Sequence, residues 1–300
     1  MSNQLNLING PIAEDIIKSK KTSGFKTFLR RILKNKPATI GFCIFMVLVI
    51  LAILAPYIIP YEIDSINMAN KLQPPSAEHI FGTDQLGRDI FSRILFGGRY
   101  SLSLGVFAIA LALLAGILIG SVAGFYGKWV DALFMRILDV VQALPTIFLA
   151  ILMSAVLGAG YATTIIALAI PNISSFARLI RAQFLKMSQQ EYVEAATSIG
   201  CSKLKIMLKH ILPNAWQPLI VASTMGMANT VLQAAALSFI GLGIQAPIPE
   251  WGAMLSASRD FMRDYPWMVI FPGIFIFITV LSLNLFGDGT RDALDPRLKS

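Results

Sequence analysis

The chain has 300 residues, of which 55% are hydrophobic and 14% charged, and its net charge is +8 at neutral pH. The mean hydropathy of +0.66 is typical of a multi-pass membrane protein. It excludes an ordinary soluble domain, in which about a quarter of the residues are charged. The positive charge does not indicate nucleic acid as a partner, because cytoplasmic loops of membrane proteins also carry a surplus of Lys and Arg.

The N-terminal third begins with two non-spanning segments. Residues 1–24 lack periodicity and are expected to form a flexible cytoplasmic tail. Residues 25–36 place apolar and basic side chains at helical spacing, which predicts an amphipathic helix on the surface of anionic membrane lipid. A DNA-binding or targeting helix is the alternative. Residues 37–59 hold no charged residue and exceed the ~20 residues that a span needs, so they predict the first transmembrane helix.

The rest of the chain contains more charge-free runs. Residues 60–99 are polar and are interpreted as an extracytoplasmic segment, and residues 100–287 as a transmembrane core. Gly158-Ala159-Gly160 divides one long run into two helices. The run that ends at residue 249 holds one span and then a Gly/Pro-rich outer loop. The fold class predicted is an all-α polytopic membrane protein with about six transmembrane helices.

Lys and Arg set the orientation, because they concentrate on the cytoplasmic side. With the N-terminus inside, the outer segments hold only six of them, Lys71, Arg88, Arg93, Arg99, Arg259 and Arg263. Both termini are therefore predicted to be cytoplasmic. The polar loop at residues 185–214 and the tail at residues 288–300 fall on the same side.

The loop at residues 185–214 predicts two short helices hinged at Gly200. Glycine takes the positive φ that ends a helix, and Ser202 is a candidate N-cap for a second helix that Pro213 is expected to stop. The small residues Ala195 and Ala196 would let another protein approach the backbone. From the residues alone, a solvated loop helix is an equally good interpretation.

Three features of this loop, Glu194-Ala195-Ala196, Gly200 and Leu212-Pro213, resemble the EAA loop in the membrane subunits of bacterial ABC importers. In that family the loop is the coupling helix that docks on the ATPase subunit. His210 stands where the usual pattern has Ile, as expected of the peptide and nickel subgroup. The resemblance implies an ATPase-coupling role for seven residues, Glu191, Glu194, Ala195, Ala196, Gly200, Leu212 and Pro213.

Further stretches at residues 81–102, 247–255 and 284–298 look like the C-type permease of the dipeptide, oligopeptide and nickel importers, although Thr290 stands where Leu is expected. The resemblance implies a type I ABC importer permease fold in the bacterial cytoplasmic membrane. It also implies a homologous second permease, two ABC ATPase subunits and an extracytoplasmic solute-binding protein as partners. The cargo implied is a di- or oligopeptide moved by alternating access, with nickel or another small solute as the alternative.

The sequence lacks the motifs of other function classes. It has no Walker A loop, so ATP and Mg would be used by partner subunits and no cofactor is expected on this chain. His79 and His210 are the only histidines, and Cys43 and Cys201 the only cysteines, and neither pair suggests an enzyme or a metal site. The nearly uncharged spans make a stand-alone channel or secondary carrier the weaker alternative.

Neutral polar residues within the spans are candidates for a translocation path, above all Asn172, Asn229, Gln233 and Asn284. Hydrogen bonding between helices is the alternative for each of them. In the outer segment Asp84, Arg88, Asp89 and Arg93 are expected to pair with one another. That segment is interpreted either as a purely structural element at the membrane surface or as a contact for an extracytoplasmic partner or a seal over the substrate path. The Asp and Arg residues after position 287 are likewise expected to pair rather than to bind metal.

Overall fold

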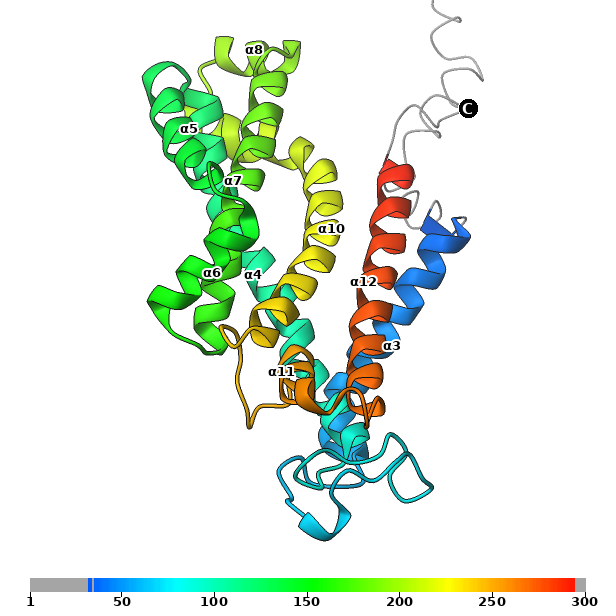
Figure 1. Ribbon diagram of the computed structural model, residues 1–300. Helices are drawn as coiled ribbons and strands as arrows, with labels where there is room; N and C mark the ends of the chain where they lie inside the picture. Colours follow the sequence, from blue (N-terminus) through cyan, green and yellow to red (C-terminus); the bar gives the residue numbers. More distant parts are fainter. Residues whose placement is uncertain (1–31, 34, 295–300) are drawn as a thin grey trace, which may run out of the picture.

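The computed structural model describes residues 32–33 and 35–294, so the predicted tail at 1–24, most of the basic helix at 25–36 and residues 295–300 lie outside the described part. Regular structure within that part is helical, apart from a single antiparallel bridge between Thr83 and Asp89 (Figure 1). The long helices are α3 (Lys36–Ile58), α4 (Ile90–Tyr126), α5 (Lys128–Gln142), α6 (Thr146–Leu157), α7 (Tyr161–Ser188), α10 (Leu212–Phe239) and α12 (Trp267–Leu294). The short ones are η2 (Met68–Asn70), α8 (Glu191–Ser198), α9 (Lys203–Lys205), the π-helical segment η3 (Ile206–Ile211), α11 (Trp251–Ala257) and η4 (Arg259–Phe261).

Five helical stretches in the described residues are long and apolar enough to cross a membrane. They are α3, α4, α7, α12 and the continuous stretch Lys203–Phe239. The pair α5 and α6, bent by 86° at a short break, makes a sixth span when counted together. This result confirms the predicted all-α membrane fold with about six spans.

Three glycines on α4 allow this helix to contact α7 closely. Gly116, Gly120 and Gly124 follow one another at four-residue spacing on α4 and face α7. A Cβ atom added at Gly120 would lie 2.4 Å from the carbonyl oxygen of Ala177 and 2.8 Å from the Cβ of Ile180. Small residues at this spacing let membrane helices pack backbone to backbone. The glycines of this run therefore mark a helix contact.

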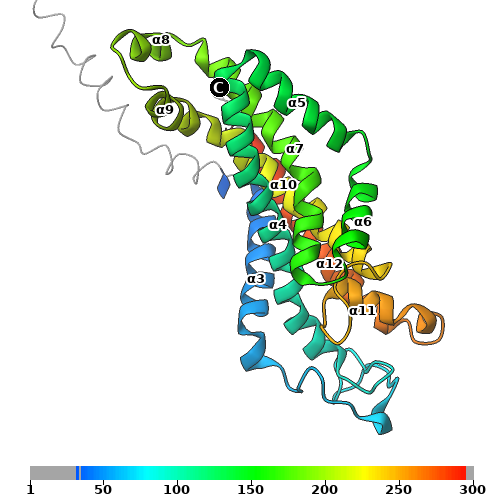
Figure 2. The same ribbon diagram turned by 90° about the vertical axis from the view of Figure 1, so that its left-hand side faces the viewer.

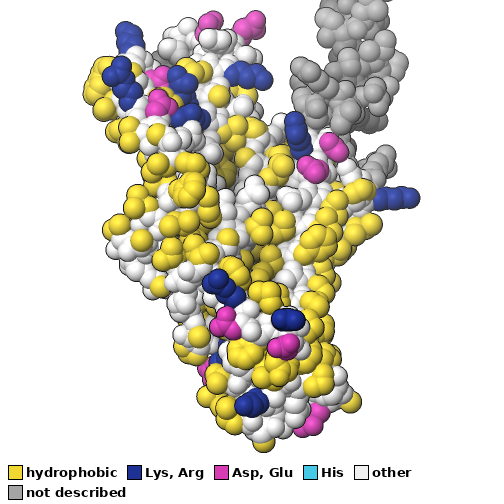
Figure 3. Space-filling model, in the orientation of Figure 1, with side chains coloured by type: hydrophobic (Ala, Val, Ile, Leu, Met, Phe, Trp, Pro, Cys, Tyr) yellow, Lys and Arg dark blue, Asp and Glu magenta, His cyan; other side chains and the backbone are white. Residues whose placement is uncertain are grey.

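The polar parts of the chain gather at two opposite ends of the helices. At one end, called here the α8 end, lie α8, the start of α3 and the end of α12 (Figure 1). At the other, the α11 end, lie α11 and the loop at residues 59–89 (Figure 1). In the space-filling view Lys, Arg, Asp and Glu cluster at the two ends, and hydrophobic side chains cover most of the region between them (Figure 3). This distribution fits a bilayer around the middle of the molecule.

The helices extend beyond several predicted segment limits, and one predicted helix end, that at Pro213, is wrong. Helix α4 begins at Ile90, not near residue 100, because the Asp89 side chain accepts a hydrogen bond from the Ser92 N–H and caps the helix there. Pro213 does not stop the helix that starts after Ser202, since the chain continues through η3 into α10. The stretch before Pro213 is π-helical, and the Leu212 N–H there bonds to the Met207 carbonyl five residues back. Such a π-helical turn is a common irregularity within helices, and the helix continues past the proline. Residues 288–294, predicted as tail, are the last turns of α12.

Candidate coupling lobe and membrane cavities

The helices α8, α9 and η3 form a compact lobe beside the spans at the α8 end (Figure 2). Within α8, Glu191, Glu194 and Ala195 are exposed, whereas Val193 and Ala196 are buried. Both glutamates occupy the first turn, where a negative charge is favoured by the positive end of the helix dipole. One face of α8 is thus acidic and accessible, and the other packs inward.

Ala196 lies inside the lobe, where it belongs to a hydrophobic cluster that includes Ile206, Met207 and Ile211. Its small side chain allows α8 to pack on η3. The expectation that both alanines lie open to another protein is therefore wrong for Ala196, which contacts this chain's own core. Ala195 alone of the two is open to a partner.

The hinge after α8 has the geometry predicted for it. Gly200 has a φ of +79°, and its N–H donates to the Thr197 carbonyl while the Cys201 N–H donates to the Ala196 carbonyl. No heavy atom lies within 4 Å of a Cβ built on Gly200, so conformation rather than space requires glycine here. Ser202 then caps α9 by accepting a hydrogen bond from the Lys205 N–H, as expected.

The lobe exposes large apolar side chains beside its charges. Tyr192, Ile199, Leu204 and Leu208 are 40%, 81%, 64% and 56% exposed. Exposed apolar residues rimmed by charge are typical of a protein contact surface. The predicted coupling residues Leu212 and Pro213 follow at the start of α10, where Leu212 packs against the core cluster and Pro213 is exposed. The lobe therefore continues directly into a membrane helix.

Two ion pairs tie α5 to α7. Arg178 donates to Asp139 at 2.6 Å, and Arg181 makes two hydrogen bonds to the two carboxylate oxygens of Asp131. A guanidinium and a carboxylate in such a two-bond contact also fix each other's orientation. Asp131 lies near the start of α5 and Asp139 near its end, so the two pairs hold α5 against α7 along most of its length.

The four candidate path residues lie on three helices. The Asn172 side chain on α7 donates to the Leu168 carbonyl at 2.8 Å, so it bonds within its own helix. Asn229 is exposed and Gln233 half-buried, one turn apart on α10, and the Oε1 atom of Gln233 is buried without a partner. Asn284 is half-buried on α12, which packs against α10. Helix α10 packs against both α7 and α12, so the four residues lie on three neighbouring helices.

Cavities at membrane depth are lined by other residues. One of about 450 Å³ lies among α7, α10 and α12 toward the α8 end and includes Gln217, Met225 and Arg291. A second, of about 210 Å³, lies where α5 and α6 meet near the middle of α7. The signal that could have found the second cavity is Pro145, because a proline inside a charge-free run marks a break.

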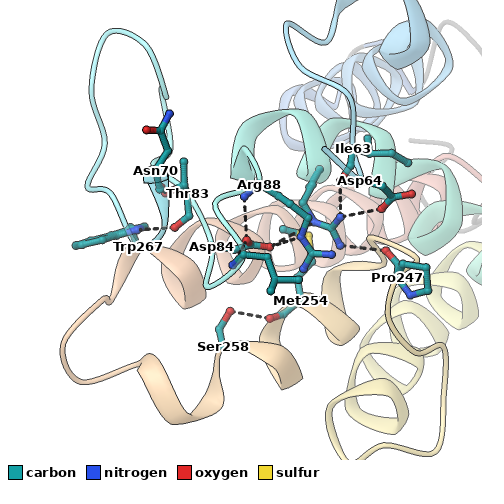
Figure 4. Close-up of polar contacts among 12 residues, drawn as sticks. Ile63, Asp64, Asn70, Thr83, Asp84, Arg88, Pro247, Met254, Ser258 and Trp267 are labelled. Atoms are coloured by element: carbon teal, nitrogen blue, oxygen red, sulfur yellow. Dashed lines mark hydrogen bonds and ion pairs between the residues drawn. The ribbon is translucent and has the colours of Figure 1, made fainter. Parts of the chain in front are cut away.

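At the α11 end, buried charges hold the loops together (Figure 4). Asp84 accepts from the Arg88 Nε at 2.7 Å and lies 3.9 Å from Arg93. Arg93 is buried and donates to the carbonyl oxygens of Ile63 and Pro247, at 2.6 and 3.1 Å. The predicted pairing is confirmed for Asp84, Arg88 and Arg93.

Asp89 departs from the expected pairing. It contacts His79 at 3.0 Å instead of an arginine, and its other carboxylate oxygen caps α4. A third buried acid, Glu250, is absent from the sequence prediction although it stands in an N-cap position before α11. It accepts from the Ala253 N–H and the Ser101 hydroxyl, and burial raises its pKa above the usual value of a glutamate. The loops at the α11 end are therefore held together by buried hydrogen bonds and ion pairs.

In the described part of the chain no three His, Cys, Asp or Glu side chains come close enough to hold a metal ion. The membrane helices, the helical lobe at one end and the hydrogen-bonded loops at the other define a multi-pass helical membrane protein.

Comparison with known proteins assigns the family. Residues 116–300 match the model of the "Binding-protein-dependent transport system inner membrane component" family. Residues 23–75 match that of the "N-terminal TM domain of oligopeptide transport permease C". The chain belongs to the family of binding-protein-dependent transport system inner membrane components.

Individual proteins similar to this chain are named as permeases of transport systems as well. The chain is 45% identical to the dipeptide transport system permease protein DppC of Alkalihalophilus pseudofirmus, over 97% of this chain and 95% of the relative. It is 43% identical to the glutathione transport system permease protein GsiD of Pectobacterium atrosepticum, over 97% and 96%. With the GsiD of an Escherichia coli strain the identity is 47%, over 91% and 90%. These relatives match the chain almost from end to end.

Among solved structures, a chain of an amino acid ABC transporter with histidines superposes with a TM-score of 0.52 at 18% identity, covering 68% of this chain and 95% of that one. This likeness supports the fold alone. The protein is thus a membrane permease subunit of an ABC importer in the bacterial inner membrane. An importer of this kind works with a further permease, an ATPase and a binding protein.

Proposed function

We propose that this permease imports short peptides, di- or oligopeptides, across the cytoplasmic membrane by alternating access. The observation that carries the proposal is the 45% identity, over 97% of the chain, to a permease named for dipeptide transport. The relatives named for glutathione, itself a short peptide, support the same class of cargo. The neutral polar residues of the spans fit a cargo that is delivered by another protein and held only weakly in passage.

The lobe at residues 191–213 is the proposed coupling site. Two ABC ATPase subunits, one on this chain and one on a second homologous permease, bind ATP and Mg, and this chain binds no cofactor. Glu191, Glu194 and Ala195 contact the ATPase, while Ala196 and Gly200 shape the lobe from inside. Because Lys203–Phe239 is one continuous helical stretch, a push on the lobe is transmitted to α10. A ligand shifts such an equilibrium only through contacts that differ between its two states.

In this arrangement the α8 end and both termini face the cytoplasm, and the α11 end faces the solute-binding protein. The distribution of Lys and Arg supports this orientation. Asn229, Gln233 and Asn284 on α10 and α12 face the proposed path. Asn172 bonds within its own helix, so it contributes to the path only if that bond opens.

Purification and transport together test the proposal. The tagged chain, solubilised gently from its native membrane, should bring with it a second permease and Walker-motif ATPases. Reconstituted with the binding protein, the complex should accumulate a labelled dipeptide only when ATP is present. Purification of this chain alone from an extract in which other membrane complexes stay intact would contradict the coupling assignment.

One substitution addresses the lobe directly. Glu194→Ala is expected to lower the amount of ATPase that copurifies, because it removes an exposed charge from the contact face. Ser188→Ala, just before the lobe, serves as control, since its hydroxyl bonds only to the Leu185 carbonyl. Equal recovery of the ATPase with both variants, together with normal transport, would make Glu194 a solvated helix residue.

A further inference from the structure

The third span is interrupted between α5 and α6. Helix α5 ends at Gln142, α6 begins at Thr146, and the two axes meet at 86°. With 12 residues, α6 is ~18 Å long, well short of the ~30 Å of a hydrocarbon core. Non-helical backbone at membrane depth is tolerated only where protein covers it or where it lines a water-filled cavity. Residues 143–145, which form the break, are exposed in this chain.

A cavity of about 210 Å³ lies at this break. A cavity of this size is large enough to hold water molecules. Gln142 and Thr146 line it from the two helix ends, and Pro171 and Ser175 line it from α7. The side chains of Gln142, Thr146 and Ser175 are exposed and make no hydrogen bond to another described residue. Their donors and acceptors are therefore available to a ligand.

The position along α7 places the cavity halfway through the spans. This helix has 28 residues and is ~42 Å long. Pro171 and Ser175 lie ~15 and ~21 Å from its first residue, at a rise of ~1.5 Å per residue. Sites near the midplane formed by a discontinuous helix are where transporters commonly hold a solute.

The polar groups of the cavity carry no charge. The nearest charges on its helices, Asp139 and Arg178, form an ion pair one turn toward the α8 end. Amide and hydroxyl groups both donate and accept hydrogen bonds, as do the N–H and C=O groups of a peptide main chain. Such a cavity therefore matches the part that all peptides share and gives no preference to a charged side chain.

We propose that the cavity at the α5–α6 break is a binding site for the main chain of the peptide during its passage. Gln142, Thr146 and Ser175 are its hydrogen-bonding groups. This assignment rests on the proposed function for the identity of the cargo. The position and chemistry of the cavity come from the structure of this chain.

The test uses the complete importer in proteoliposomes with its loaded binding protein and three labelled dipeptides: alanyl-alanine, glutamyl-alanine and lysyl-alanine. The variant Gln142→Leu, Thr146→Val, Ser175→Ala removes the three polar groups at similar volume. Uptake of each dipeptide is expected to fall about tenfold, the equivalent of one or two net hydrogen bonds. The ratio of variant to wild-type uptake should agree within about a factor of two across the dipeptides. ATP hydrolysis stimulated by the loaded binding protein should change less than about twofold.

Two matched variants separate chemistry from packing. Gln142→Asn, Thr146→Ser, Ser175→Thr keeps the polar groups and should keep most of the uptake. Ser154→Ala with Ser188→Ala removes hydroxyls from the same α6 and α7 outside the cavity and should leave uptake unchanged.

Three results would overturn the site. They are normal uptake by the apolar variant, a parallel loss of uptake and stimulated hydrolysis, and a loss confined to one dipeptide. In each case ATP-driven uptake by the wild-type importer in the same experiment leaves the proposed function standing. A wild-type importer that takes up none of the three dipeptides would overturn that function and this site with it.

Discussion

At the scale of single residues, Ala195 and Ala196 show how two identical neighbours take different roles. They differ by about 100° around α8, so one faces solvent and the other joins the cluster around Ile206 and Ile211. A contact motif read from sequence treats them as a unit. In the folded lobe, Ala195 is available to an ATPase while Ala196 sets how close α8 lies to η3.

Substitution separates these two roles. Ala196→Phe should overpack the lobe, at a cost of ~1–3 kcal/mol, and make it sensitive to protease in detergent. Ala195→Phe should leave protease resistance at the wild-type level but reduce the recovery of the ATPase, because it adds bulk to the exposed face. Limited proteolysis and copurification measure the two effects. Equal protease sensitivity of the two variants would contradict this packing of the lobe.

Gly200 is a second residue whose identity matters by itself, because its backbone conformation favours glycine. Gly200→Val should force a β-branched residue into a φ of +79°, at a cost of at least ~1–2 kcal/mol. Uptake should fall at least tenfold while the amount of chain in the membrane stays unchanged. Gly273→Val is the control, since Gly273 also has open space around it but lies within α12 at ordinary helical φ. Uptake by Gly200→Val at the level of this control would show that the turn is not required.

At the scale of elements, the packing of α4 on α7 and the continuity of the lobe with α10 organise the molecule. Glycines at four-residue spacing bring α4 against α7, and the ion pairs of Arg178 and Arg181 attach α5 to the same helix. Helix α7 therefore connects the long helix α4, the interrupted span and the coupling lobe. The lobe lies between α7 and α10 in the chain, so its movement is transmitted toward the α11 end by these two helices.

The α4–α7 contact predicts one strong effect on stability. Gly120→Leu should separate the two helices, because even a Cβ atom would lie 2.4 Å from the Ala177 carbonyl oxygen. Overpacking of this kind is expected to cost at least ~2 kcal/mol, visible as a lower midpoint of thermal unfolding in detergent. Leu118→Ala, on the 69% exposed side of the same helix, should shift the midpoint little. Equal midpoints for the two variants would contradict the packing of these helices.

At the scale of the whole molecule, the two ends differ in construction. The α8 end carries an exposed lobe with apolar and charged side chains and a hinge at Gly200. The α11 end is held by buried polar residues, among them Arg93 and Glu250, which join segments distant in sequence. An exposed lobe at one end and a rigid frame at the other suit the proposed function, in which motion at the lobe is converted into reorientation of the spans.

The rigid frame depends on Arg93. Arg93→Met should remove the bonds to the Ile63 and Pro247 carbonyls and the contact with Asp84, at ~1.5–3 kcal/mol for each charged hydrogen bond lost. The loop at residues 59–89 should then be cut faster by protease added at the α11 end. Arg259→Met, at an exposed arginine of the same end, should leave the cleavage rate unchanged. A wild-type rate for Arg93→Met would show that the loops are held without it.

The sequence by itself determined the all-α membrane fold and the positive φ at Gly200, because hydrophobic run length, the distribution of charge and glycine chemistry are local properties. The motif in the loop at residues 185–214 also indicated the family, and the comparisons confirm this family. Only the tertiary structure decided that Ala196 is buried and that Asp89 pairs with His79. It also decided that Pro213 lies inside a continuing helix, and that the break before α6 forms a polar cavity against α7. Each of these depends on which segments meet in space, and packing between distant residues leaves no periodic signal in the chain.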